Sequence, residues 1–252
     1  MSDGTRTRGR RDHNPELYQL SYAHQGDPES SGVLGSVGLD LLALTFDDGP
    51  DPRGTPAVLD ALAEADSRAT FFVLGERVAA RPDLVDRAID AGHAVELHGH
   101  RHLRHPHNTR EAVEADLEAA LAALDAVGVT PRRWRIPWGH LAPFTVPLAQ
   151  AHGLEVVGWS VDTHDWRGDS AAAMLGDVAP QLRAGAIVLM HDGVGAGARR
   201  AETAATAALV SPLVRAARAR GLEPGPVTGD WPVPVPLGNP DFAVPGLGSP
   251  AA

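Results

Sequence analysis

Short apolar runs alternate with amphipathic stretches from Leu41 to the end of the globular part of the sequence. A run without polar alternation, such as Leu41–Phe46, is typical of a strand that is buried on both faces. Breakers, mostly glycine or proline, follow several of these runs. The pattern predicts strands over residues 41–46, 69–74, 94–97, 134–136, 154–159, 186–190 and 227–228.

The stretches between these runs have the spacing of helices. The clearest covers residues 109–127, where Val113, Leu117 and Leu124 recur at helical intervals and Gly128 supplies a stop. Further helices are predicted over residues 55–65, 82–91, 144–152, 170–183 and 200–220. Because strands and helices alternate throughout, we predict an α/β fold with a single distorted (β/α) barrel of about seven parallel strands.

The two ends of the chain lack this periodicity. Residues 1–37 are rich in Gly, Ser, Arg, Asp and His, and we predict a flexible N-terminal arm there. Residues 38–230 form one predicted catalytic domain without an internal linker. Residues 231–252 are rich in proline and glycine and predict an irregular tail.

Composition narrows the classes of partner and cofactor. A formal net charge of -10 argues against nucleic acid or an anionic membrane as partner. The absence of cysteine excludes disulfides and thiolate metal sites, so His, Asp or Glu must hold any metal. No apolar run is long enough for a transmembrane helix, and the basic N-terminus has no apolar segment of a signal peptide behind it. We therefore expect a cytoplasmic location unless another export route operates; the sequence does not indicate an oligomeric state.

Titratable residues follow the ends of several predicted strands. Asp47 and Asp48 end the first strand, His98 follows the third, and His191 follows the sixth. The carboxyl ends of parallel strands meet at one edge of a sheet, where α/β folds place their chemistry. The Asp-Asp-Gly-Pro segment also suits a plain tight turn. The other strand ends favour a functional site.

His98 and His102 are candidate metal ligands. Residues four apart can share one face of a helical turn and bind one ion together. The alternative is a solvated loop, because several other histidines crowd the same stretch. Two imidazoles and a carboxylate would leave coordination positions open for water and substrate. An acid at a neighbouring strand end therefore favours a metal site.

Other polar and aromatic residues near these strand ends have two interpretations each. A lone His191 would be an ordinary rim histidine, whereas a carboxylate partner would orient it and raise its pKa. Arg135 would ordinarily be a structural ion-pair partner, but beside two adjacent acids it is expected to keep one of them ionised. Trp138 and Trp166 are suited either to a core or to the apolar face of a sugar.

Five ordered motifs resemble the polysaccharide deacetylases, the NodB-homology domain of carbohydrate esterase family 4. The resemblance covers about Leu41 to Val227. Its segments are Thr45–Pro50 (TFDDGP), His98-x-x-x-His102, Arg135-x-Pro137-Trp138-Gly139, Asp162–Trp166 and Leu189-Met190-His191. Two positions depart from the commoner pattern, with Gly99 in place of Ser or Thr and Trp138 in place of Tyr or Phe.

The resemblance implies a NodB-like barrel and a role for each motif residue. It implies that Asp47 is the general base, that His191 is the general acid, and that a divalent metal, with zinc the expected ion, is bound. The implied metal ligands are Asp48, His98 and His102. The implied supporting residues are Arg135 for Asp47, Asp165 for His191, and Trp138, Trp166 and Leu189 for the substrate.

The expected function is metal-dependent hydrolysis of acetyl groups from N-acetylated, or O-acetylated, carbohydrate. The expected partner is an acetylated glycan or a small amide. One alternative is an intracellular hydrolase of another small amide or a cyclic imide on the same scaffold. A second is a non-catalytic glycan-binding relative. A non-haem iron oxygenase also uses two histidines and a carboxylate, but the additional base, acid and arginine favour hydrolysis.

Overall fold

The computed structural model describes residues 33–34 and 41–227. Nine strands are present in this part of the chain. They are β1 (Val33–Leu34), β2 (Leu41–Asp47), β3 (Thr70–Val73), β4 (Ala94–Leu97), β5 (Arg133–Trp134), β6 (Glu155–Val157), β7 (Val161–Asp162), β8 (Ile187–His191) and β9 (Glu223–Gly225).

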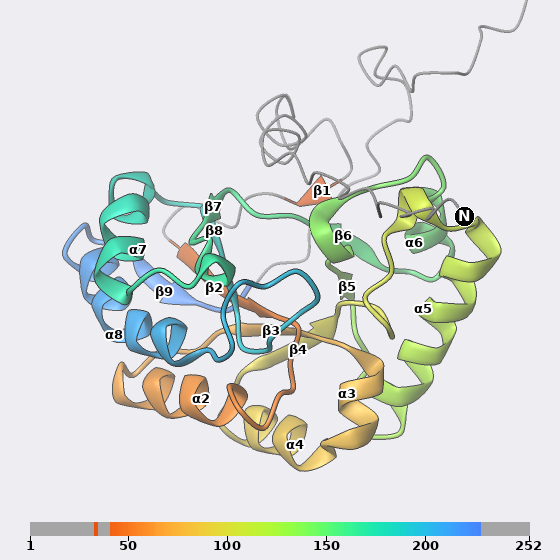
Figure 1. The fold of residues 1–252 in the computed structure, drawn as a ribbon, viewed down its shortest axis with the longest axis horizontal. Coiled ribbons are helices and arrows are strands. Elements are labelled where there is room, and N and C mark those ends of the chain that lie inside the picture. The colour runs from red at the N-terminus through yellow and green to blue at the C-terminus, as the bar shows by residue number, and fades with distance from the viewer. Residues whose placement is uncertain (1–32, 35–40, 228–252) are drawn as a thin grey trace, which may run out of the picture.

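Helices connect most of these strands and form an outer layer around them (Figure 1). The α-helices are α2 (Thr55–Glu64), α3 (Gly75–Ala80), α4 (Pro82–Asp90), α5 (Arg110–Asp125), α6 (Thr145–Ala151), α7 (Ala171–Val178) and α8 (Ala204–Arg218). The two with the strongest local start signals are α5 and α7. Their caps Thr109 and Ser170 each accept a hydrogen bond from a backbone N–H of the first turn.

The sheet is parallel throughout and runs in the order β1-β6-β5-β4-β3-β2-β8-β7, with β9 paired to the start of β2. Strands β6 and β7 stand far apart in this order, yet residues 158–160 alone connect them. Three linking residues span at most about 14 Å. The sheet therefore curls until these two strands approach one another, and its carboxyl edge becomes a rim.

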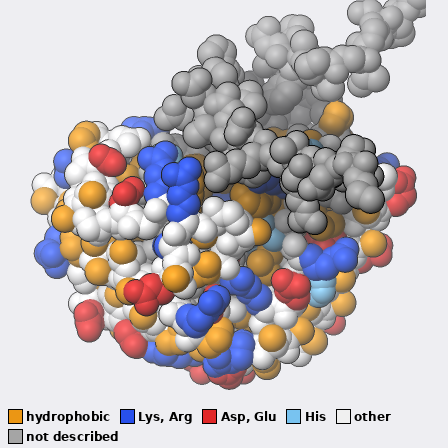
Figure 2. All heavy atoms as spheres, in the orientation of Figure 1, with side chains coloured by type: hydrophobic (Ala, Val, Ile, Leu, Met, Phe, Trp, Pro, Cys, Tyr) orange, Lys and Arg blue, Asp and Glu red, His pale blue; other side chains and the backbone are white. Residues whose placement is uncertain are grey.

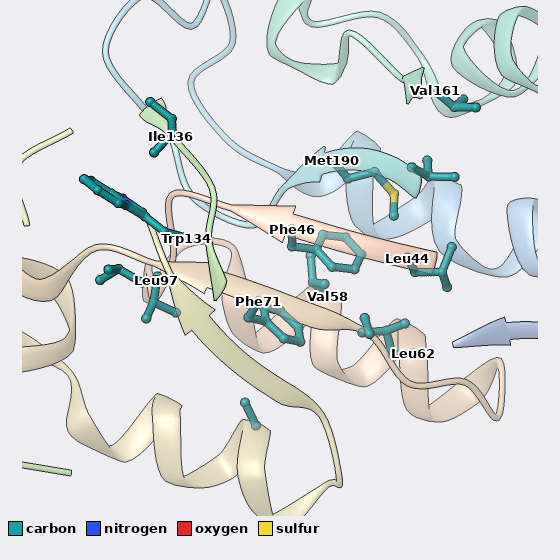
Figure 3. Close-up of a cluster of buried hydrophobic side chains, with 14 of the residues drawn as sticks. Leu44, Phe46, Val58, Leu62, Phe71, Leu97, Trp134, Ile136, Val161 and Met190 are labelled. Carbon is teal, nitrogen blue, oxygen red and sulfur yellow. The ribbon is translucent and has the colours of Figure 1, made fainter. Parts of the chain in front are cut away.

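Side-chain alternation divides each strand between an outer and an inner face. Leu44 and Phe46 of β2 pack outward with Met190 of β8 against helix side chains such as Val58 and Leu62 (Figure 3). Burying one such side chain contributes about 1.5–3 kcal/mol. The alternate residues of β2 and β8 then face the inside of the barrel, which is where the polar residues lie.

The barrel and six of the seven predicted strands are confirmed, with shifts at their ends. The predicted strand over residues 154–159 is shorter, because the chain leaves the sheet after Val157 and rejoins it as β7. The predicted last strand lies earlier, at Glu223–Gly225, and Thr228 is outside the described residues. Helix α3 was not predicted, because its six residues follow β3 almost directly and are too few to show a stripe.

The predicted arm over residues 1–37 lies outside the described residues except for Val33–Leu34, which pair with β6. The predicted tail over residues 231–252 lies outside them as well. Within the described part, no helix has the length and apolar character that crossing a membrane requires. On the face shown in Figure 2, acidic and basic side chains are interspersed.

Candidate functional site

Strand β2 delivers two carboxylates to the rim in different orientations. Asp47 is the last strand residue, lies on the inner face, and pairs in register with His191 of β8. Asp48 follows with a φ of 72°, in the left-handed region that residues other than glycine adopt rarely. Both side chains are buried. The two acids therefore reach the rim from different backbone conformations, one in the strand and one in the left-handed region.

The carboxylate of Asp47 is held by Arg135, which follows β5. Arg135 Nη1 donates to Asp47 Oδ1 at 2.9 Å and to Thr45 Oγ1 at 2.6 Å, while Nη2 donates to the carbonyl of Gly158 at 2.9 Å. Burial raises the pKa of Asp47 to about 6, against the opposing effect of Arg135. Breaking a buried ion pair of this kind typically costs about 3–5 kcal/mol. Arg135 therefore serves the fold as well as the carboxylate.

Asp48, His98 and His102 converge on one point. One ligand atom from each lies within 4.8 Å of the other two. Asp48 Oδ1 is 3.6 Å from His98 Nε2 and 3.3 Å from His102 Nε2. The same oxygen is buried and accepts no hydrogen bond within the described residues. A buried carboxylate oxygen without a donor is rare in proteins, so this cluster is suited to a cation.

The protonation of His98 is fixed by its surroundings. Its Nδ1 lies 2.7 Å from the carbonyl oxygen of Arg135. Because a carbonyl oxygen only accepts, Nδ1 carries the hydrogen and Nε2 keeps a free lone pair toward Asp48. Burial lowers the pKa of both His98 and His102, which favours the neutral imidazoles that bind metals.

The segment from His98 to His102 is a turn, and the predicted helical face is wrong. Gly99 has a φ of 101° and His102 a φ of 58°. Their left-handed backbone conformations bring the two imidazoles together, although residues 98–102 do not form a helix. The four-residue spacing therefore predicted correctly that His98 and His102 lie close together, but not the backbone conformation that brings them there.

His191 forms a second charged pair with Asp165, which begins a short 3-10 helix after β7. His191 Nδ1 lies 2.7 Å from Asp165 Oδ1, and the His191 backbone N–H donates to Oδ2 at 2.9 Å. Burial would lower the pKa of His191, but Asp165 prevails and raises it to about 10. Burial acts to raise the pKa of Asp165, but the charge and hydrogen bond of His191 outweigh it, so this pKa lies below its usual range. The imidazole is therefore protonated at neutral pH, and its Nε2 is its remaining N–H donor.

The three residues expected to contact substrate are placed differently. Leu189 is buried two residues before His191, on the same inner face of β8. The Trp138 ring is half-buried against His102, with ring centroids 5.0 Å apart. Trp166 is half-buried beside the Asp165 segment. All three positions border the polar residues of the rim, and their roles stay predictions.

Several residues support the site without having been expected from the sequence. Arg200 Nη1 and Thr206 Oγ1 donate to Asp165 Oδ2 at 2.9 and 2.7 Å. Arg77 of α3 donates to the carbonyl of Asp48 at 2.7 Å. These residues lie about 30 to 40 positions from their partners. No local pattern in the sequence could have connected them.

The whole arrangement has the parts that metal-assisted hydrolysis requires. Asp48, His98 and His102 can hold a divalent ion with positions left open. Asp47 lies beside them as an ionisable carboxylate. The protonated His191 lies opposite Asp47 on the neighbouring strand β8. Two imidazoles with one carboxylate are a donor set of catalytic zinc sites.

Sequence comparisons identify one protein family and several individual proteins to which this chain is similar. A family model described as polysaccharide deacetylase matches residues 35–157. The chitooligosaccharide deacetylase of Bradyrhizobium sp. (strain ANU 289) is 38% identical over 194 residues, which cover 73% of this chain and 87% of that protein. The peptidoglycan-N-acetylglucosamine deacetylase PgdA of Listeria monocytogenes is 40% identical over 152 residues, or 60% of this chain. The aligned part is 32% of PgdA, so this chain spans about a third of that relative.

A solved structure with the same fold is the family 4 carbohydrate esterase from Streptomyces lividans in complex with acetate. It matches with a TM-score of 0.67 at 29% sequence identity, over 75% of this chain and 93% of that one. The likeness therefore covers nearly the whole of a compact esterase domain.

Proposed function

Since this chain belongs to the polysaccharide deacetylase family, we propose that it hydrolyses the acetamido group of N-acetylated sugars in a glycan, with a divalent metal. The family and the hydrolase class that the sequence predicted are confirmed by the relatives. The substrate class follows those relatives, which are named for chitooligosaccharides and for peptidoglycan N-acetylglucosamine.

The observation that carries this proposal is the convergence of three groups at one rim. The ligand cluster of Asp48, His98 and His102 lies next to the Asp47–Arg135 pair, and His191 lies in register with Asp47. A zinc ion bound by the cluster would polarise the amide carbonyl and lower the pKa of a coordinated water. A glycan-binding module without catalysis would have no need of a separate base and acid.

Asp47 is suited to accept the proton of the attacking water. With a pKa of about 6 its carboxylate is ionised at neutral pH, yet basic enough to take a proton. Arg135 holds one of its oxygens, Oδ1, and so orients the other toward the ligand cluster, where His98 Nε2 lies 3.8 Å from Oδ2. The base is thereby fixed in direction as well as in charge.

His191 is suited to protonate the departing nitrogen. An amine leaves poorly unless it is protonated, so the reaction needs an acid opposite the base. Asp165 occupies Nδ1 of His191, which leaves the Nε2–H for donation. Asp165 itself is held by Arg200 and Thr206, so it orients the imidazole without moving. This is the geometry of an oriented general acid.

The test of the proposal is Asp47→Asn after zinc reconstitution, with acetate release measured on acetylated glycans and small acetamides and ring opening measured on cyclic imides. We expect activity to fall by roughly 10²–10⁴-fold, the contribution of a general base, while metal content stays near that of the wild type. Asp162→Asn is a matched control, because Asp162 ends β7 at the same rim. Its Oδ1 accepts a hydrogen bond from the backbone N–H of His164 at 2.7 Å.

An Asp47→Asn variant with full activity would show that the base is assigned wrongly. Turnover of a small amide or imide by the wild-type protein, with none on any glycan, would favour the alternative substrate class. No turnover of any compound by a zinc-loaded wild-type protein would favour the non-catalytic glycan binder.

A further inference from the structure

The turn that carries both histidine ligands has an unfavourable backbone. We call residues 98–102 the ligand turn. Its Gly99 and His102 both have positive φ values, and His102 has a side chain that disfavours this region. A residue other than glycine in the left-handed region costs of order 1–3 kcal/mol and persists only where the surroundings hold it. Something outside the turn must therefore supply that restraint.

Asp116 of α5 is placed to supply it. Its carboxylate accepts the backbone N–H of His100 at 2.8 Å and that of Arg101 at 3.2 Å. The same group accepts Arg101 Nε at 3.1 Å. The side chain is 6% exposed, and it lies on the buried face of α5 between Val113 and Leu117. A carboxylate on the apolar face of α5 therefore accepts hydrogen bonds from the backbone N–H groups in the middle of the ligand turn.

Helix α3 holds the turn from the other side through backbone contacts. The N–H of Gly75 donates to the carbonyl of Gly99 at 2.9 Å, and that of Glu76 donates to the carbonyl of His100 at 3.3 Å. A Cβ at Gly75 would come within 2.8 Å of Ala120 on α5. The two helices thus meet at the turn, and among the described residues Asp116 is the one whose carboxylate accepts hydrogen bonds from its N–H groups.

We propose that Asp116 is a positioning residue for the metal ligands. This inference rests on the ligand set of the proposed function. By satisfying two N–H groups of the strained turn, the carboxylate keeps His98 and His102 turned toward Asp48 before any ion arrives. Without it the turn relaxes to other conformations, and binding a metal must reorder it. Asp116 thus raises metal affinity without touching the metal.

The test is the zinc dissociation constant of the full chain, measured by competition with a chelator. We expect Asp116→Asn and Asp116→Ala to weaken zinc by roughly 10–100-fold, the usual effect of a residue that orients metal ligands. At zinc concentrations above the new dissociation constant, kcat returns to near the wild-type value, because Asp116 contacts neither substrate nor reacting atoms.

Two controls separate this role from general stability. Glu118→Gln changes an exposed acid two residues further along α5 and leaves zinc affinity within about twofold. Arg101→Gln removes the ion pair with Asp116 but keeps both backbone bonds, and it also leaves the affinity nearly unchanged. A purely structural Asp116 would instead lower the melting temperature of the metal-free protein with no change in the zinc dissociation constant.

The outcomes distinguish this inference from the proposed function. A wild-type protein that binds no stoichiometric zinc overturns the ligand set itself. A wild-type protein that binds zinc, together with a folded Asp116→Asn variant of equal affinity, overturns only the role of Asp116. If Asp116→Ala does not fold, the isosteric Asp116→Asn still decides the question.

Discussion

Two pairs of histidines from one short stretch of chain have different surroundings. His98 and His102, the ligand pair of the proposed function, direct Nε2 toward Asp48 Oδ1, which accepts no hydrogen bond within the described residues. His93 and His105, the core pair, lie a few residues to either side. Burial lowers the pKa of all four. Neither the residue type nor the direction of the pKa shift therefore separates the two pairs.

Each imidazole of the core pair has a hydrogen-bond partner at Nδ1. His93 Nδ1 accepts the backbone N–H of Ala69 at 3.2 Å, and its ring packs edge-on against Phe71. His105 Nδ1 lies 2.9 Å from Thr145 Oγ1, and its ring packs against Trp134. The hydrogen-bonding partner of the imidazole distinguishes the two pairs. In the proposed ligand pair, Nε2 faces a carboxylate oxygen that accepts no hydrogen bond within the described residues, whereas in the core pair Nδ1 faces an amide N–H or a hydroxyl.

The largest predicted difference between the pairs is in metal binding and activity. We expect His98→Ala and His102→Ala each to lose stoichiometric zinc and to lower activity roughly 10³-fold or more, equivalent to about 4 kcal/mol. Metal content by mass spectrometry and acetate release measure the two effects. His93→Gln is the matched control in the core pair, and its folded protein keeps one zinc.

Tight zinc binding by both alanine variants of the ligand pair would refute the ligand set. Loss of zinc from a folded His93→Gln protein would remove the distinction between the pairs.

The next largest difference is in stability. We expect His105→Ala to lower the free energy of unfolding of the metal-free protein by about 2–4 kcal/mol, through a cavity beside Trp134 and a lost bond to Thr145. Chemical denaturation measures it. His107→Ala is the control, because His107 is exposed in the same short 3-10 helix, and its effect should be near zero. Equal effects of the two substitutions would mean that the His105 contacts are not stabilising.

The fold could be read from the sequence because its strands are continuous apolar runs. Strand β2 was predicted to within one residue, since Leu41–Phe46 has no polar interruption. Strand β7 has two residues and exists only because it pairs with β8. Such a strand has no pattern of its own. Strand β7 forms where the curled sheet brings residues 161–162 next to β8. The sequence predicted the barrel but not this individual pairing.

The site was predictable where it depends on strand ends and not where it depends on packing. Asp47, Asp48 and His191 were placed together at one rim because parallel strands end there, and the structure has them at that rim. Arg200 reaches Asp165 from a loop far along the chain and had no signal. Asp116 had one, because an acid stood at a position of α5 that the helical period assigns to the core. A polar residue on an apolar face is thus a useful sign of a tertiary partner.

The smallest predicted difference concerns pH. The pKa of His105 in the folded protein is about 4, because it is buried, against a value of 6.5 for an ordinary histidine. Between these values the unfolded chain binds more protons, so acid favours unfolding. The stability that neutral His105 contributes is complete above pH 6.5 and is lost as the pH falls toward 4.

This loss can be isolated by comparing variants, because other buried groups titrate in the same range and some with the opposite sign. Burial raises the pKa of Asp47 to about 6, for example, so acid stabilises the fold at that residue. We expect the stability gap between wild type and His105→Gln to shrink by roughly 1–3 kcal/mol from pH 7 to pH 4.5. Denaturation curves of the metal-free proteins at each pH measure it. The gap to His107→Gln should stay constant, because His107 is exposed and makes none of the contacts of His105. A gap to His105→Gln that also stayed constant would mean that His105 is not held neutral by the core.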